Sequence, residues 1–461
     1  MYYDLSGDRI TVTNDAARLA WNDTLEALLA HAAATPEHLA RTLKADPDFA
    51  LAHAAKGLML LSLARSELVG PARECLATAE AAIAVRPVTR RERMVVEALA
   101  LWLSDAPRQA AHRLESILDD HRFDVLALKL SHGLRFMLGD QNEMLASLRR
   151  VAPGFEETHP LTGYVNGCYA FALEEHGFYA EAETAGRRAV ALSPRDAWGR
   201  HAVAHVLEMT GRTEEGVAWL SDDRNWAHAN NLRFHIVWHL ALFHLEQGKI
   251  SEVLRLYDED IRREQTDDYR DIANGASLLA RLEYAGADVG TRWDELAARA
   301  EGRIHDGRLV FADLHYALSL LGAGHTDSAE TIARSLVQDS KFHPSVERRD
   351  AARNGAMAAY GLIAFREGDY DEASRLLGAA RKGLVVIGGS HAQRDLFEQA
   401  YTESLIRSGS HDLASEILRN RLAQRGGSNL YAAKRLAMLR NRSAGRAAAL
   451  VVAATPLAIA H

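Results

Sequence analysis

Histidine is concentrated in one short stretch of this chain. Six of its 21 histidines lie between positions 201 and 244, namely His201, His205, His228, His235, His239 and His244. His201, His205 and Glu208 follow one another at spacings of four and three residues, and His235 precedes His239 by four. These spacings place each set on one face of an α-helix. Side chains grouped in this way can chelate a transition metal ion, or can move protons between neutral imidazole and carboxylate at neutral pH.

Metal binding is the sharpest of the chemical hypotheses for these residues. His201, His205 and Glu208 with His235 or His239 supply enough ligands for zinc or iron, so a divalent transition metal is a candidate cofactor. The zinc-protease motif needs a Glu directly after its first His, and residue 202 is Ala, which excludes that class of protease. A metal-free acid–base site with Glu208 orienting a histidine is an open alternative. So is a purely structural role, in which each ring only donates to a neighbouring oxygen.

The composition is that of a folded helical protein. Hydrophobic residues make up 48% and charged residues 25%, which excludes a disordered chain. Apolar residues recur at helical spacing almost throughout, and strand-like alternation is confined to residues 10–13. A net charge of -8 predicts that the chain binds no nucleic acid. Two cysteines are typical of a reducing cytoplasmic protein, and Cys168 is expected to be a packed residue rather than a nucleophile.

Neither end of the sequence predicts a targeting or membrane segment. The first eight residues include two aspartates and no apolar core, so no secretory signal is expected. The apolar stretch over residues 447–460 contains Pro456 and is shorter than the ~20 residues that span a bilayer. We therefore expect no membrane partner, and a terminal helix or tail at this end.

A helix–turn–helix unit repeats along the chain. From Tyr169 the sequence reads YAFALEEHGFYAEAETAGRRAVALSP, in which Gly177, Ala182, Ala189 and Pro194 stand at the offsets of a tetratricopeptide repeat. Gly177 suits the positive φ of a helix end, and Pro194 stops the second helix. Similar turns occur at Gly211, Gly248, Gly324, Gly368 and Gly409, with a weaker one at Gly139. The longer intervals after Gly248 indicate either that some repeats are stretched or that one repeat is hidden near residues 271–296.

These repeats predict an all-α, tetratricopeptide-repeat-like right-handed superhelix, an α-α solenoid that curls around a central groove or pocket. We expect an N-terminal arm over residues 1–23, a continuous solenoid over 24–440, and a C-terminal tail or terminal helix over 441–461. The clearest repeats cover residues 163–196, 197–222, 234–262, 310–338, 354–383 and 395–425.

The resemblance to tetratricopeptide repeats also implies which side chains face the groove. The first helix of each repeat lines it, mostly through positions 2, 5, 6, 9 and 12 when the turn glycine is position 15. On this count the groove receives the candidate catalytic residues His201, His205, Glu208, His235 and His239. The candidate substrate-binding residues are Tyr164, Trp198, Trp238, His315, Arg394 and Asp395. Curvature of the superhelix must bring the last three to the others.

Five blocks of sequence resemble a particular group of these proteins. They are RPVTRRE (86–92), LALKLSH (126–132), DAW-x-x-H-x-x-AH-x-x-EM (196–209), H-x-x-WH-x-AL (235–242) and GGS-x-AQRD (388–395). The chain is similar in these blocks to the tetratricopeptide repeat protein 38 family, from about residue 25 to 435. The resemblance implies an architecture and marks positions, but it supplies no reaction.

Two classes of function are therefore open. In the first, the histidine-lined cavity is a pocket for a small polar metabolite, with hydrolase- or isomerase-type chemistry. In the second, the groove is a scaffold that binds an extended peptide or a protein partner, which predicts a long open groove rich in Lys, Arg and Asn. Clustering of His, Tyr and Trp in mid-chain favours the pocket. The sequence indicates neither the substrate nor the oligomeric state.

Overall fold

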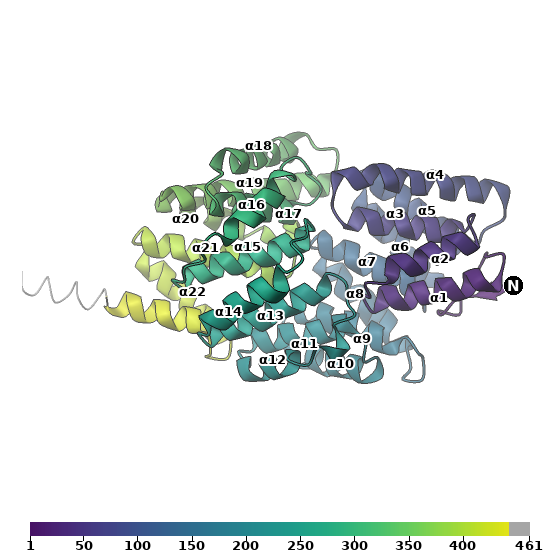
Figure 1. Cartoon of the computed structure of the whole chain (residues 1–461), viewed down its shortest axis with the longest axis horizontal. Helices are drawn as coiled ribbons and strands as arrows, with labels where there is room; N and C mark the ends of the chain where they lie inside the picture. Colours follow the sequence, from purple (N-terminus) through teal and green to yellow (C-terminus); the bar gives the residue numbers. More distant parts are fainter. Residues whose placement is uncertain (442–461) are drawn as a thin grey trace, which may run out of the picture.

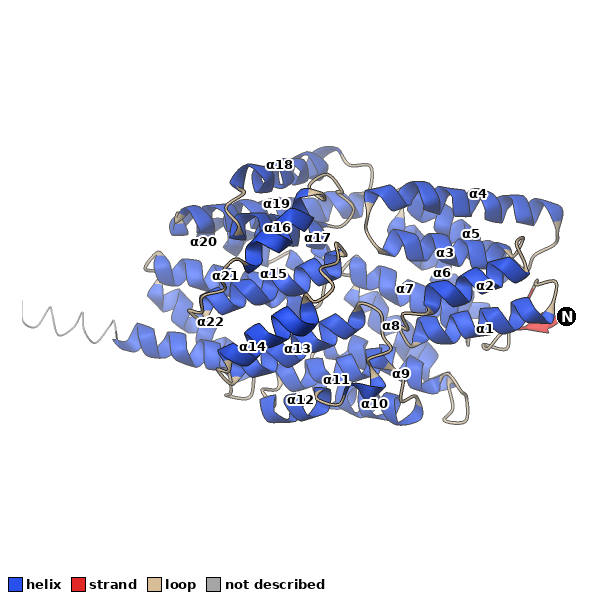
Figure 2. Cartoon of the chain, in the orientation of Figure 1, coloured by secondary structure: helices blue, strands red, loops and turns tan. Residues whose placement is uncertain are grey.

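Antiparallel helix pairs follow one another through residues 15–424 of the computed structural model, which describes residues 1–441 (Figure 1). Almost every described residue outside the turns is helical (Figure 2). The order and pairing of these helices confirm the prediction of an all-α, tetratricopeptide-repeat-like superhelix. The apolar stretch 447–460 lies outside the described residues. No described helix has both the length and the apolar character needed to cross a membrane.

The helices pair in chain order. The first five pairs are α1 (Asp15–Leu29) with α2 (Thr35–Ala45), α3 (Ala50–Ser62) with α4 (Val69–Val85), α5 (Arg90–Leu103) with α6 (Pro107–Asp120), α7 (Val125–Met137) with α8 (Gln141–Val151), and α9 (Thr162–Glu174) with α10 (Tyr179–Leu192). The next six are α11 (Ala197–Met209) with α12 (Thr213–Leu220), α13 (Leu232–Glu246) with α14 (Ile250–Leu256), α15 (Tyr269–Tyr284) with α16 (Arg292–Glu301), α17 (Val310–Gly322) with α18 (Thr326–Phe342), α19 (Val346–Glu367) with α20 (Tyr370–Arg381), and α21 (His391–Arg407) with α22 (His411–Gln424). Short helical turns η1 (Ser66–Leu68), η2 (Ala152–Gly154), η3 (Asp223–Asn225), η4 (Tyr257–Ile261) and η5 (Leu384–Ile387) lie between them, and residues 430–441 are helical.

The N-terminal arm is shorter than expected. Strands β1 (Tyr2–Tyr3) and β2 (Arg9–Ile10) pair antiparallel, and the first helix begins at Asp15, inside the range 1–23. Asn14 determines this start, because its side chain accepts a hydrogen bond from the backbone N–H of Ala17 and caps the helix. The arm therefore ends at residue 14.

The turn glycines identified in the sequence all adopt positive φ. Gly139, Gly177, Gly211, Gly248, Gly324, Gly368 and Gly409 have φ between 65° and 86°. Gly286, with φ 86°, follows α15, which together with α16 forms the repeat expected near residues 271–296. At Gly139 the lack of a side chain is also a packing requirement, because a Cβ would lie 1.9 Å from the carbonyl oxygen of Val385.

Small residues at the repeat positions allow the paired helices to approach closely. Ala182, Ala189 and Ala373 are each 0% exposed, as the repeat register predicts. Substitution of any one by leucine is expected to overpack its helix–helix contact and to lower the free energy of unfolding by about 1–3 kcal/mol. Urea titrations of Ala182→Leu and of the matched surface variant Ala180→Leu, on the same helix, measure this. Equal midpoints for the two variants would show that the register is wrong.

The superhelix closes on itself through polar contacts between its two halves. Ser66 Oγ lies 2.8 Å from Oδ1 of Asp306, and Arg108 Nε lies 3.2 Å from Oε1 of Glu347. At the start of α21, Arg394 Nη2 lies 3.4 Å from Oε2 of Glu175, which directly follows α9. These contacts join segments more than 200 residues apart in the sequence, so helices of the last repeats reach the middle of the chain.

Candidate metal centre and adjoining pocket

Four histidines meet between two neighbouring repeats. His201 and His205 lie on α11, and His235 and His239 lie on α13. One ring nitrogen from each lies within 4.8 Å of the corresponding atom of every other, and all four rings are buried or nearly so. The ring centroids of His205 are 4.4 Å from those of both His201 and His239. The repeat register thus brings both helix faces to one point.

Oxygen acceptors outside the cluster fix the orientation of these rings. Nδ1 of His235 lies 2.7 Å from Oδ1 of Asn274, and Nδ1 of His239 lies 3.0 Å from Oε2 of Glu208. An amide or carboxylate oxygen only accepts, so both rings donate from Nδ1 and keep a lone pair on Nε2. Nδ1 of His205 lies 3.4 Å from Oε2 of Glu174, an ion-pair distance without a hydrogen bond. Metal-binding histidines characteristically have such partners on the nitrogen that does not bind the metal.

Some ring nitrogens of the cluster have no hydrogen-bond partner among the described residues. Nε2 of His205 and Nε2 of His201 lie 2.9 Å apart, although the Glu174 contact favours a proton on the other nitrogen of His205. Nε2 of His239 and Nδ1 of His201 are buried and have no hydrogen-bond partner among the described residues. A buried polar atom without a partner costs about 1–3 kcal/mol, which binding of a cation by its lone pair would relieve.

Burial keeps His201, His235 and His239 neutral, the form in which histidine binds metals. It lowers the pKa of His201 and that of His239 well below the usual value of 6.5, and the neighbouring rings lower both further. Burial also lowers the pKa of His235, to about 4, against the opposing effect of Asn274. At neutral pH the lone pairs of these rings are therefore available without loss of a proton.

A second group of ligand-type atoms adjoins the first and shares His205 with it. Its other members are Glu174, Glu175 and His391, with one atom of each within 4.8 Å of the rest. Nε2 of His391 lies 2.6 Å from Oε1 of Glu174. Burial disfavours both charges, but the pair outweighs it: Glu174 and Glu175 raise the pKa of His391 to about 9, while His391 and His205 lower that of Glu174 to about 2. Glu174 and His391 therefore form an ion pair next to His205.

The four-histidine cluster fits a divalent transition metal. Nitrogen ligands bind zinc at about 2.0–2.1 Å, so two ligands of one ion lie no more than about 4.2 Å apart. The ring nitrogens, which lie within 4.8 Å of one another, would reach that spacing by small side-chain rotations. Imidazole ligands suit zinc, iron, copper and nickel. The carboxylates of Glu208 and Glu174, each beside one of the rings, would balance the charge of the ion.

A cavity of about 100 Å³ adjoins the cluster. His201 and His235 form part of its wall, and aromatic side chains form much of the remainder: Phe136, Trp198, Tyr269 and Phe311. Trp198 stacks on His31, with ring centroids 5.3 Å apart and planes at 15°. An apolar enclosure beside a few polar groups is typical of a small-molecule site.

Arg270 supplies a positive charge to this cavity. Asp268 accepts hydrogen bonds from its Nε at 2.9 Å and its Nη2 at 2.7 Å, which fixes the guanidinium plane. Nη1 makes no hydrogen bond among the described residues, and Arg270 lines the cavity together with Gln393 and Ser390. A guanidinium held in this way can bind a carboxylate or phosphate oxygen of a ligand.

The predicted substrate-binding residues divide between the cavity and other places. Trp198 lines the cavity, whereas Trp238 is fully buried behind it, stacked on His235 and donating from Nε1 to Oγ of Ser277. His315 lies between Phe311 and Phe397, and its Nδ1 donates to the backbone carbonyl of Phe311 at 2.7 Å. His315 thus has the structural role described for an interface histidine.

Three other sequence assignments are corrected by position. Tyr164 lies in the hydrophobic core of the first half of the chain, where burial raises its pKa to about 12, and it does not line the cavity. Asp395 faces a different cavity and binds Arg421. Arg394 contacts Glu175 and so supports the second group rather than the first. A count of helix positions takes no account of how the repeats before Gly177 and Gly409 are oriented once the superhelix closes.

Several functional candidates were missed by the sequence argument. Glu174 occupies position 12 of the repeat whose turn glycine is Gly177, so the same count of helix positions could have found it. His391 stands inside the GGS-x-AQRD block, immediately after the cap residue Ser390. Asn274 and Arg270 belong to the repeat whose register was hidden, and no sequence signal marked them.

Asp196, the first residue of the DAW block, is expected to make stability depend on pH. Burial raises its pKa to about 7, although Lys129 acts in the opposite direction, whereas an unfolded Asp has a pKa of about 3.9. The folded state therefore binds a proton that the unfolded state releases, and stability falls as pH rises from about 4 to 7. Asp196→Asn is expected to raise the free energy of unfolding on the order of 2 kcal/mol at pH 8, with no gain below pH 4. Urea titrations at both pH values test this, and an equal gain at both would contradict it.

Comparison with known proteins adds little beyond the fold. No family model matches the chain. Two solved structures with a similar helix arrangement are a human IFIT1 dimer with m7Gppp-AAAA and a monomeric IFIT1 mutant with Gppp-AAAA. The first is 15% identical with a TM-score of 0.40 and covers 95% of this chain and 96% of that chain. The second is 15% identical with a TM-score of 0.39 and covers 90% and 99%. At these values the likeness carries no inference about ligands of this chain.

The expectation that the chain binds no nucleic acid is nevertheless corrected, because the net charge does not exclude such a ligand. It depends on the net charge of -8 alone. The two similar structures are of IFIT1 with m7Gppp-AAAA and with Gppp-AAAA. The charge of the whole chain is therefore no ground for excluding a nucleic-acid ligand here.

Proposed function

We propose that this chain is a metal-dependent helical-repeat protein of the tetratricopeptide repeat protein 38 family. His201, His205, His235 and His239 hold one divalent transition metal ion, and the adjoining cavity takes a small polar metabolite. The expected chemistry is of the hydrolase or isomerase type. The observation that carries the proposal is the combination of converging ring nitrogens with outer partners that fix their protonation.

The structural alternative explains these four rings poorly. A structural histidine uses its nitrogens on protein oxygens, as His228 does with the carbonyls of Ala30 and Arg195 at 3.2 and 3.1 Å. The cluster instead turns nitrogens toward one another, and two of them are buried without partners. A shared cation would bind the lone pairs of ring nitrogens that have no protein donor among the described residues, such as Nε2 of His239.

The residues of the chain divide the work between metal and substrate. Asn274, Glu208 and Glu174 orient the metal-binding rings. A bound divalent ion supplies Lewis-acid chemistry, polarising a substrate oxygen or lowering the pKa of a water molecule. Arg270 binds an acidic group of the substrate, and the aromatic walls of the cavity exclude bulk water. Recognition of an anionic group beside the metal favours a small carboxylate or phosphate compound as the ligand.

Metal loading of the purified full-length protein tests the proposal. The chain is stripped with a chelator, incubated separately with Mn²⁺, Fe²⁺, Ni²⁺, Cu²⁺ and Zn²⁺, desalted, and measured by elemental analysis. We expect one equivalent of at least one ion to be retained. Retention of none of the five would overturn the metal proposal and leave acid–base chemistry or a scaffold that binds a peptide or protein partner.

A further inference from the structure

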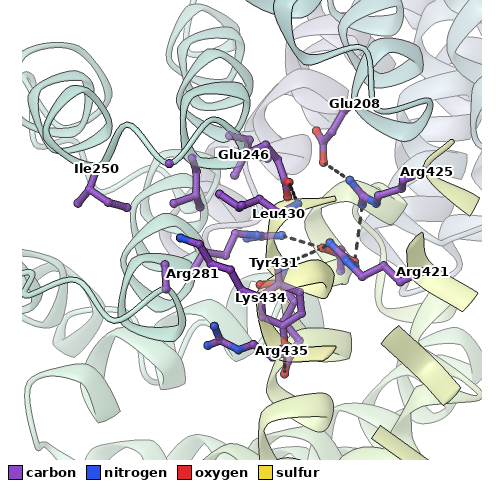
Figure 3. Close-up of a pocket in the computed structure, with 16 residues that line it drawn as sticks. Glu208, Glu246, Ile250, Arg281, Arg421, Arg425, Leu430, Tyr431, Lys434 and Arg435 are labelled. Carbon is purple, nitrogen blue, oxygen red and sulfur yellow. Dashed lines mark hydrogen bonds and ion pairs between the residues drawn. The ribbon is translucent and has the colours of Figure 1, made fainter. Parts of the chain in front are cut away.

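A second cavity, of about 50 Å³, lies where α11, α13 and α15 meet α21, α22 and the last helical segment (Figure 3). Cationic side chains outnumber carboxylates around it. The cations are Arg281, Arg421, Arg425, Lys434 and Arg435, and the carboxylates are Glu208, Glu246 and Asp395. Arg435 is neutralised from outside by Glu403, 2.7 Å from its Nε, which still leaves one cation in excess.

Three guanidiniums converge on a single carboxylate in this cavity. Nη2 of Arg421 lies 2.9 Å from Oδ2 of Asp395, whereas Nη2 of Arg425 and Nη2 of Arg281 approach that carboxylate only to 3.8 and 3.9 Å (Figure 3). One carboxylate cannot make close paired hydrogen bonds with three guanidinium groups. Positive charge is thus in excess around Asp395, and the three guanidinium groups that supply it line the cavity.

The lack of close carboxylate partners is clearest for Arg425. The residue is 5% exposed, yet its side chain makes no hydrogen bond among the described residues, and its other carboxylate neighbour, Glu208, is 3.6 Å away. Arg281, 4% exposed, donates only to the backbone carbonyls of Ser277 and Ala392, and burial lowers its pKa. A buried guanidinium normally has a bound anion or a close carboxylate, because burying an unpaired charge is costly.

We propose that this cavity is a binding site for a phosphate group, either free inorganic phosphate or the phosphate of a small metabolite. Arg425 and Arg281 bind its oxygens from the buried side, and Lys434 binds from the exposed side. A water molecule needs about 10–15 Å³ of such space, so a cavity of about 50 Å³ has room for a group of several oxygen atoms. The site is distinct from the four-histidine cluster, and the proposal does not depend on metal binding.

Isothermal titration of the metal-free full-length protein with inorganic phosphate tests this inference, with chloride at matched ionic strength as the blank. We expect saturable binding at one site per chain. Arg425→Gln should weaken it at least tenfold, and Lys434→Gln, a surface change with no risk to folding, should weaken it several-fold. Arg419→Gln, on the exposed face of α22, is the matched control and should bind as the wild type does.

The source of the phosphate group is distinguished by a second titrant. Glycerol 3-phosphate binding more tightly than inorganic phosphate assigns the site to a phosphorylated metabolite, and weaker binding assigns it to the free ion. The proposal is overturned if the wild type shows no saturable binding at millimolar phosphate, or if Arg425→Gln and Lys434→Gln both bind as tightly as Arg419→Gln. Failure here leaves the metal proposal untouched, because metal loading is measured separately.

Discussion

His239→Ala is expected to abolish retention of metal by the purified protein and to weaken metal binding by more than about 100-fold. His239 is 0% exposed, its Nδ1 donates to Glu208, and its Nε2 has no hydrogen-bond partner in the described part of the chain. The substitution removes one of four ligands and leaves space that a water molecule fills less favourably. Loss of an outer partner alone typically costs about 10–100-fold in metal affinity, so loss of a ligand must cost more.

Substitution of the outer partners is expected to give metal affinities between those of the wild type and His239→Ala, which a purely structural cluster would not show. Asn274→Leu removes the acceptor of His235, and Glu208→Gln removes the charge beside His239, while every ring remains in place. Both variants should retain the same metal with about 10–100-fold weaker affinity. His112→Ala, a substitution on the exposed face of α6, is the control and should match the wild type.

Thermal unfolding with and without metal distinguishes a metal-binding role of these histidines from a purely structural one. A ligand that binds only the folded state raises stability with its concentration, so added metal should raise the Tm of the wild type and of His112→Ala. The Tm of His239→Ala should not respond to metal. If His239→Ala retains as much metal as the wild type with the same affinity, the four-histidine cluster is not the binding site.

Much of this site was predictable because the repeat carries its own register. From α7 onward a glycine with positive φ follows the first helix of each pair, and counting back from Gly211 and Gly248 gives the helix face of every histidine in the cluster. The two sets meet because adjacent repeats place equivalent faces side by side. The same count, applied to the repeat before Gly177, gives Glu174.

The remaining parts of the site depend on long-range packing that a local pattern does not encode. His391 reaches Glu174 only because the superhelix closes, and that closure depends on contacts such as Arg394 with Glu175. Asn274 could not be placed because its repeat, with Gly286 as the turn, has no strong small-residue signature. Tyr164 shows the opposite error: it is in register for the groove, but packing in the first half of the chain covers that position.

Arg91 is buried although its local sequence predicts an exposed side chain. The run of Arg90, Arg91 and Arg93 predicts the first turn of a solvated helix, and α5 does begin at Arg90 with a capping box between Thr89 and Glu92. The Arg91 side chain, however, is only 1% exposed. The N-terminal arm folds over it, and arms of this kind carry no periodic pattern from which burial could be predicted.

Arg91→Leu is accordingly expected to lower the free energy of unfolding by about 3–5 kcal/mol. Nη2 of Arg91 lies 2.7 Å from Oδ2 of Asp4, and its Nε lies 2.5 Å from Oδ2 of Asp124, with both carboxylates fully buried. Without the guanidinium, two carboxylates remain in the interior with no cation, and burial already raises the pKa of Asp4 to about 6. Urea titration at pH 7.5, where an unfolded aspartate is ionised, measures the loss.

Arg90→Leu is the matched control one residue away. Arg90 is 78% exposed and pairs with Asp120, which is 60% exposed, so its loss should change the free energy of unfolding by less than about 1 kcal/mol. Adding Asp4→Asn to Arg91→Leu should recover part of the loss, because the amide oxygen can still accept from the backbone N–H of Ser6 while one buried charge disappears. If Arg91→Leu costs no more than Arg90→Leu, the arm does not cover Arg91 in solution. The first turn of α5 is then solvated, as the arginine run alone predicts.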